Sequence, residues 1–218
     1  MKIACFGGSF NPVHIGHVKL VEAIYEAGYE KIIVIPAFHS PFKEAFADTT
    51  DQDRLTMLEL AFKNHSYVEI EKCEIERGGI SYTIDTMKYL QEKLKNQGVD
   101  FEKLSLVIGS DLISSFHKWK SAEELASLVD IVLAKRPLED INFQELNFPY
   151  SHKEINNDLY DISSSMIRKR IQNRESVVKL LPEDIVTDPA VEADSLESFP
   201  FISGLDDNYK ASVDSFQK

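Results

Sequence analysis

The fold is decided by the stretch GGSFNPVHIGH at residues 7–17. The residues before it, 2–6, form an apolar run that is typical of a buried strand. From residue 14 to about residue 27, apolar residues recur at helical spacing until a glycine ends the pattern. A strand, a glycine loop and a helix in this order form one unit of a parallel sheet that helices cover on both faces. The first part of the sequence therefore predicts an α/β protein.

The same alternation of strand and helix continues along the chain. Strands are predicted at residues 2–6, 31–36, 68–75, 104–108, 130–134 and 158–162. Helices are predicted at residues 14–27, 83–97 and 121–128, after an N-cap region at 50–53, and after the serines at 163–165. We therefore expect a doubly wound parallel sheet in one domain that covers residues 1–182.

Three stretches fit this pattern less well. In the third strand the alternation changes phase between residues 70 and 73, which predicts a bulge. The charged run 69–77 is expected to face water. Residues 138–157 show no clear period, and Pro182 is expected to close the regular structure.

Charge is distributed unevenly along the 218 residues. The chain has 24 Lys and Arg against 36 Asp and Glu, a net charge of −12, and 43% of it is hydrophobic, as in an ordinary soluble globular protein. This acidic balance argues against nucleic-acid partners, because lysines and arginines drive such binding. The last 36 residues, 183–218, carry nine acids and two lysines. We expect an acidic C-terminal extension there, most simply solvated, with folding back or self-association as the alternative.

Neither a membrane nor a disulfide is indicated. No apolar stretch approaches the roughly 18 residues of a membrane span, and the glycine at position 7 comes too early for a secretory signal. Both cysteines, Cys5 and Cys73, lie in apolar runs, which suits buried thiols in a reducing compartment. The cytoplasm is therefore the expected location.

The loop at residues 7–17 is suited to binding a phosphate. Its glycines allow the backbone to approach an anion closely, and the N–H groups and dipole of the following helix attract negative charge. His14 and His17 are three residues apart and could both donate to phosphate oxygens from one helical face. The alternatives are a structural turn with two solvated histidines or a metal pair. Since no further ligand lies at metal-binding spacing, we expect no metal bound by the protein here.

A second candidate element is the stretch ISSSMIR at residues 162–168, which starts a helix after a predicted strand. Serine hydroxyls and N–H groups at a helix start also suit phosphate, and Arg168 can fork onto phosphate oxygens. Taken alone, the stretch is more typical of an ordinary capped helix than of a phosphate site.

Together the two elements resemble the HxGH nucleotidyltransferases. The motifs SYT at 81–83, IGSD at 108–111 and FHKW at 116–119 resemble, within this superfamily, the bacterial nicotinate-nucleotide adenylyltransferases. The resemblance covers residues 2–182 and implies a Rossmann-like nucleotidyltransferase fold. Members of the family join ATP to nicotinate mononucleotide and produce deamido-NAD and pyrophosphate.

The resemblance also implies roles for individual residues. The residues that would hold and activate the phosphates are His14, His17, Lys43 and Arg168. Those that would bind ATP are Gly8, Ser9, Phe10, Gly109, Asp111, Ile162, Ser163 and Ser164. Those that would bind the nicotinate nucleotide are Tyr82, Thr83, Trp119 and Arg136. Mg²⁺ is expected with ATP, carried by phosphates and water, because no carboxylate cage is visible.

Physical arguments bear on the second substrate. Thr83 would open a helix whose unpaired N–H groups prefer a carboxylate to a carboxamide, so the acid is favoured over the amide. Trp119 could stack on a flat ligand or be a half-buried core aromatic. Arg136 could equally be a solvated surface charge, and Asp111 a helix N-cap.

The chain departs from the family pattern in three places that bear on activity. Asn11 and Phe42 replace the usual aspartate and histidine, and Lys120 replaces a common tyrosine. Asn11, Phe42 and the acidic extension leave open a nucleotide-binding sensor with weakened chemistry. A transferase for nicotinamide mononucleotide or another phosphate-bearing acceptor is a further alternative. The motif HIGH also occurs in class I aminoacyl-tRNA synthetases, but this chain is too short and too acidic for one. A homo-oligomer stays possible.

Overall fold

The structure, a computed structural model, describes residues 1–39, 41, 49–136 and 148–186. The chain divides into two compact units, each of which is described by itself. The first unit comprises Met1–Ser9, Lys19–Ala45 and His65–Asp161, and the second comprises Phe10–Val18, Phe46–Asn64 and Ile162–Lys218. Helix α1 (Ile15–Glu26) begins in the second unit and continues in the first. No helix in the described part of the chain is both long and apolar enough to cross a bilayer.

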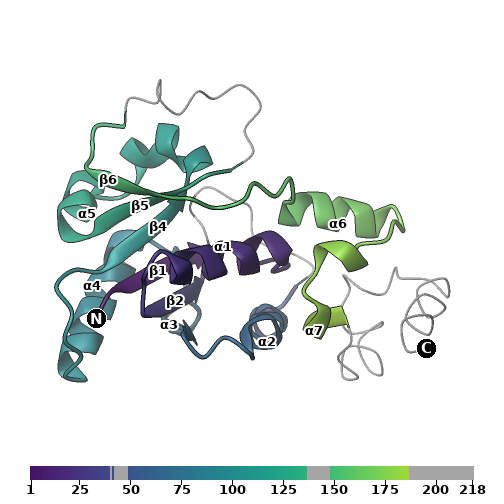
Figure 1. Cartoon of the computed structure of the whole chain (residues 1–218), viewed down its shortest axis with the longest axis horizontal. Coiled ribbons are helices and arrows are strands. Elements are labelled where there is room, and N and C mark those ends of the chain that lie inside the picture. The colour runs from purple at the N-terminus through teal and green to yellow at the C-terminus, as the bar shows by residue number, and fades with distance from the viewer. Residues whose placement is uncertain (40, 42–48, 137–147, 187–218) are drawn as a thin grey trace. The chain divides into compact units, whose positions relative to one another are not determined.

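The first unit is built on a six-stranded sheet in which every pairing is parallel (Figure 1). The strand order is β3-β2-β1-β4-β5-β6, so the chain moves outward in one direction and then returns past β1 to continue in the other. The strands are β1 (Ile3–Gly8), β2 (Lys31–Pro36), β3 (Val68–Ile70), β4 (Ser105–Gly109), β5 (Asp130–Ala134) and β6 (His152–Ile155). This confirms the prediction of a doubly wound parallel sheet.

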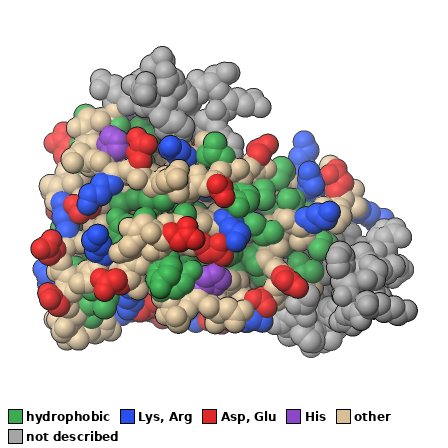
Figure 2. Space-filling view, viewed as in Figure 1, with side chains coloured by type: hydrophobic (Ala, Val, Ile, Leu, Met, Phe, Trp, Pro, Cys, Tyr) green, Lys and Arg blue, Asp and Glu red, His purple; other side chains and the backbone are tan. Residues whose placement is uncertain are grey.

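One face of this sheet is covered by α4 (Thr83–Asn96), the 3₁₀ helix η1 (Ser110–Lys118) and α5 (Ala122–Leu128). Alternate strand residues point into this core, and the residues between them are buried as well, as expected for strands covered on both sides. The face of the molecule that Figure 2 shows carries acidic and basic side chains interspersed with one another. The four central strands, β1, β2, β4 and β5, and the helices α4 and α5 thus form where the sequence predicts them.

The charged run that follows β3 differs from its prediction. The strand ends at Ile70, and a five-residue helix, α3 (Cys73–Arg77), replaces the predicted bulged strand. Two acids expected to face water, Glu71 and Glu74, are only 5% and 7% exposed. Their partners come from α4: Lys93 Nζ lies 2.5 Å from Glu71 Oε2, and the Thr86 hydroxyl donates to Glu74 Oε1 at 2.6 Å. Because these partners are distant in sequence, the local charge alternation does not reveal the burial.

The last strand also lies elsewhere than predicted. It is β6, within the stretch that shows no clear period, and residues 158–162 contain no strand. β6 is an edge strand with three of its four residues exposed, so it carries no apolar alternation. Asn157, two residues beyond it, accepts from Lys135 N and donates to Lys135 O.

The second unit is helical and has its own small core. Its helices are α2 (Asp51–Phe62), α6 (Ser164–Gln172), η2 (Val178–Leu180) and α7 (Glu183–Val186). Regular structure therefore continues one short helix beyond Pro182. Lys63 Nζ, just after α2, lies 2.6 Å from Asp184 Oδ1 in α7. The core is formed by Ile167, Ile171, Val177 and Leu181, with Leu60, Ile162, Leu180 and Val186 packed against it.

Candidate active site

The order of the strands locates where a ligand should bind in the first unit. The connections run in opposite directions from β1 and β4, which are neighbours, so the sheet has its switch point between them. In open parallel sheets, ligands bind beyond the carboxyl ends of the strands at this point. β1 ends at Gly8 and β4 ends at Gly109, two of the predicted ATP-binding residues.

In the second unit, the first loop places its two histidines ring against ring. The imidazoles of His14 and His17 stack with their centroids 3.6 Å apart, and the Phe10 ring meets His17 edge-on at 5.0 Å. The backbone N–H of His14 donates to His17 Nδ1 at 3.2 Å. Since Nδ1 accepts this bond, a neutral His17 carries its proton on Nε2. Phe10 is buried and has a φ of +46°, a backbone conformation that non-glycine residues seldom adopt. The loop thus holds its rings in one constrained arrangement.

The same unit joins this loop to the beginning of α6. Ser163 caps α6 by accepting from Met166 N, and the Ser164 hydroxyl donates to Pro12 O at 2.9 Å. Arg168 Nη1 donates to Asn11 O at 2.7 Å. The histidine loop and the late arginine therefore meet in the structure, across a separation of 157 residues. Partial burial lowers the pKa of Arg168, which nevertheless stays a cation at neutral pH.

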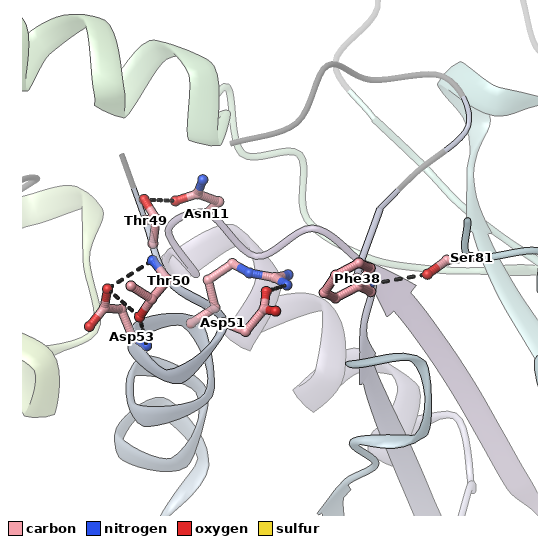
Figure 3. A network of polar contacts seen from close by, with 8 residues as sticks. Asn11, Phe38, Thr49, Thr50, Asp51, Asp53 and Ser81 are labelled. Atoms are coloured by element: carbon pink, nitrogen blue, oxygen red, sulfur yellow. Dashed lines mark hydrogen bonds and ion pairs between the residues drawn. The ribbon is translucent and has the colours of Figure 1, made fainter. Parts of the chain in front are cut away.

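Two residues that the sequence did not single out also lie in this unit. The Thr49 hydroxyl donates to Asn11 Oδ1 at 3.0 Å (Figure 3). Arg54 of α2 is fully buried, and its Nη2 lies 2.5 Å from Asp51 Oδ1. Arg54 shares a helical face with the buried Leu58 four residues later, and a charge on an apolar face was the available signal. Asn11 Nδ2 is buried and has no hydrogen-bond partner among the described residues.

In the first unit, Gly109, Asp111 and Arg136 come together at the end of β4. A Cβ on Gly109 would lie 2.2 Å from Asp111 Oδ1 and 3.3 Å from Arg136 Cγ, so only glycine leaves both side chains in place. Asp111 Oδ1 lies 4.0 Å from Arg136 Nε, and Arg136 N donates to the Ser110 hydroxyl. Gly109, rather than Asp111, takes the N-cap position of η1. The arginine is thus part of this cluster rather than an isolated surface charge.

The residues predicted to bind the pyridine also belong to the first unit. α4 begins at Thr83, and its N-cap residue Tyr82 makes no side-chain cap hydrogen bond. Trp119 is half-buried, its ring centroid lies 5.1 Å from that of Phe116, and its buried Nε1 has no partner within the described residues. Trp119 therefore packs against the core while retaining an unused donor. Lys120 Nζ lies 4.5 Å from the centre of the Tyr82 ring.

The polar groups of the second unit are suited to an anion. Its predicted site residues present imidazoles, a guanidinium and the serine-capped start of α6, all of which donate. No group of three or more His, Cys, Asp or Glu that could hold a metal ion occurs among the residues that the structure covers. Lys43, predicted to bracket the leaving phosphates, and Phe42 lie outside the described residues.

The parallel sheet with its switch point at β1 and β4, together with the HxGH loop joined to α6, defines a nucleotidyltransferase of the Rossmann-like class. Residues 5–170 match the family model described as cytidylyltransferase-like, and the chain belongs to this family. It is 41% identical to the probable nicotinate-nucleotide adenylyltransferase of Borrelia garinii subsp. bavariensis, over 84% of this chain and 88% of that relative. The probable nicotinate-nucleotide adenylyltransferase of Treponema pallidum (strain Nichols) is 38% identical, with 85% and 94% covered.

Solved structures agree on the fold. The chain is similar to Plasmodium falciparum nicotinic acid mononucleotide adenylyltransferase complexed with NaAD, with a TM-score of 0.66 and 21% sequence identity. This similarity covers 85% of this chain and 95% of the other. A second structure of that protein, complexed with APC, gives a TM-score of 0.65. The predicted family resemblance and the predicted fold are both confirmed.

Proposed function

We propose that this chain transfers the adenylyl group of ATP to nicotinate mononucleotide, and releases deamido-NAD and pyrophosphate. The observation that carries the proposal is the joining of the histidine loop to α6 through Arg168–Asn11 and Ser164–Pro12. Three of the predicted phosphate-binding residues, His14, His17 and Arg168, belong to this one unit. The names of the relatives in Borrelia and Treponema support the same reaction.

The reaction requires positioning and charge stabilisation rather than a protein nucleophile. A phosphate oxygen of the mononucleotide attacks the α-phosphorus of ATP in line, and the bond from that phosphorus to the pyrophosphate oxygen breaks. Negative charge spreads over the phosphate oxygens as this happens. His14, His17 and Arg168 donate to these oxygens in our proposal. Lys43 would add a further cation.

The two nucleosides would be recognised by residues of the first unit. Asp111 accepts from the adenosine ribose in our proposal, and Gly109 keeps that carboxylate in place because a Cβ would displace it. The start of α4 at Tyr82 and Thr83 would hold the pyridine carboxylate, and Trp119 would stack on its ring. Arg136 would bind the phosphate of the mononucleotide.

A divalent cation enters as part of the ATP substrate. The donors and cations of the second unit suit phosphate oxygens rather than a metal ion. Mg²⁺ bound mainly by phosphates and water fits this set, because such an ion needs few protein ligands. We also propose a cytoplasmic location, since both thiols are buried and free, which suits a reducing compartment.

Turnover of the two pyridine mononucleotides tests the reaction. Pyrophosphate release is measured with nicotinate mononucleotide and with nicotinamide mononucleotide at equal ATP. Faster release with the acid is expected, because helix N–H groups favour a carboxylate. Equal or reversed preference would contradict the assignment of the acceptor. Tight ATP binding without any release would indicate the sensor instead.

Substitution of His17 tests the first loop. His17→Ala should lower turnover about 100- to 1000-fold, the usual cost of removing one donor to developing negative charge. Its stability should fall by about 1–3 kcal/mol, because the buried backbone N–H of His14 loses its acceptor. Pyrophosphate release and thermal unfolding measure the two effects. His152→Ala, on the exposed edge strand, is the matched control and should be fully active. An intact rate in His17→Ala would remove this loop from the reaction.

A further inference from the structure

The start of α4 carries a lysine that the proposed reaction does not yet use. Lys120 Nζ lies 2.9 Å from Asp85 Oδ2, in the first turn of α4, and 4.5 Å from the centre of the Tyr82 ring. Lys120 and Asp85 are 46% and 41% exposed, so a solute can reach both. The ammonium therefore lies beside the helix start that would receive the pyridine ring.

Asp85 creates an electrostatic conflict at this helix start. An acid in the first turn stabilises a helix because it faces the positive end of the macrodipole. The same negative charge opposes the approach of a second carboxylate to those N–H groups, so an unpaired Asp85 would weaken the advantage of an acidic ligand. Pairing with Lys120 cancels the charge of Asp85 without removing the helix dipole.

We propose that Lys120 is a specificity-determining residue, which maintains the preference for a pyridine carboxylate over a carboxamide by neutralising Asp85 at the start of α4. This inference rests on the proposed function and deepens it. The Tyr82 ring contributes by holding the lysine in place, since a cation over an aromatic face is attracted to it. Lys120 acts through the local charge and performs no chemical step.

Lys120→Met tests this role, because it removes the charge and keeps an apolar stem that can cover the Tyr82 ring. The ratio of kcat/KM for nicotinate mononucleotide to that for nicotinamide mononucleotide should fall about two- to fivefold, the range for one charge at a helix end. The change should lie in KM for the acid, with kcat and the KM for ATP unaltered. In about 1 M salt the difference should largely vanish.

The reciprocal variant separates charge from packing. Adding Asp85→Asn to Lys120→Met should restore the ratio, since the double variant lacks both charges. Lys88→Met is the matched control. Lys88 lies on α4, the helix that carries Asp85, and its Nζ is 2.5 Å from Glu124 Oε1; both side chains are exposed. It should leave the ratio unchanged. Trp119 is the only tryptophan, so its fluorescence reports binding of each mononucleotide at this site without catalysis.

The outcomes distinguish this inference from the proposed function. Suppose that the unaltered chain turns over nicotinate mononucleotide, and that Lys120→Met has the same ratio of kcat/KM values and the same binding by Trp119 fluorescence. The inference is then wrong and the function stands. A fall in the ratio that Asp85→Asn does not reverse would also overturn it, because the effect would then be one of packing. If the unaltered chain neither binds nor turns over nicotinate mononucleotide, the function and the inference both fail.

Discussion

At the scale of single residues, the most direct prediction concerns Gly109. Gly109→Ala places a Cβ 2.2 Å from Asp111 Oδ1, and the exposed Asp111 side chain must then move away. The fold should survive, but the KM for ATP should rise about tenfold or more, the cost of losing a hydrogen bond to a charged group. Steady-state kinetics and thermal unfolding measure the two effects.

A double variant gives the control for Gly109. If the glycine acts through Asp111, then Gly109→Ala should add little to the effect of Asp111→Ala on the KM for ATP. Fully additive effects would show that Gly109 contacts the nucleotide independently of the carboxylate.

Residue chemistry was predictable where the signal is local. The histidine loop and the Arg168 helix each carry their donors within a few residues, so each could be identified from its own stretch of sequence. Glu71, Glu74 and Thr49 could not be predicted, because their partners lie 12 to 38 residues away. A buried acid cannot be distinguished from an exposed one in the sequence until the residue that pairs with the buried acid is known.

At the scale of elements, α2 depends on its N-cap residue, Thr50. Thr50 accepts from Asp53 N, and Thr50 N donates to Asp53 Oδ2 at 2.9 Å, so two otherwise unpaired N–H groups are satisfied together (Figure 3). Thr50→Ala should destabilise the protein by about 1 kcal/mol and lower Tm by about 2–4 °C for a chain of this size. Thermal unfolding followed by circular dichroism measures the change.

Thr56, in the middle of the same helix, provides a comparison, because its replacement by alanine is not expected to lower stability. Thr56→Ala loses only a 3.4 Å contact from Gln52 and gains helix propensity, so it should be neutral or slightly stabilising. Equal losses in the two variants would indicate a general requirement for threonine in α2 rather than capping.

Elements were predictable in proportion to their burial. β1, β2, β4 and β5 are buried and apolar, and their predicted bounds are correct within two residues at each end. Of the two edge strands, β3 begins at the predicted residue but ends after only three residues. β6 has three of its four residues exposed, so its sequence lacks the periodicity that identifies a strand. The sheet order could still be expected, because it follows from the central strands and their connecting helices.

At the scale of the whole molecule, the unusual property is net charge. The chain carries −12 and has a pI of about 5.0, yet both proposed substrates are anions. A field of like sign slows the encounter with a charged ligand, and salt reduces that effect. The acids after residue 186 contribute strongly, since 187–218 contain seven acids and two lysines.

Truncation after Val186 tests this effect while keeping α7 and its Lys63–Asp184 ion pair. The variant loses a net charge of −5, so kcat/KM for ATP should rise about twofold in low salt and match the full chain in about 0.5 M salt. Replacing the seven acids with their amides in the full-length chain is the control, because it removes the charge and keeps the segment. If truncation lowers kcat/KM while the amide variant does not, the extension contributes contacts to binding or to assembly. Gel filtration of both proteins would then identify which of the two is lost.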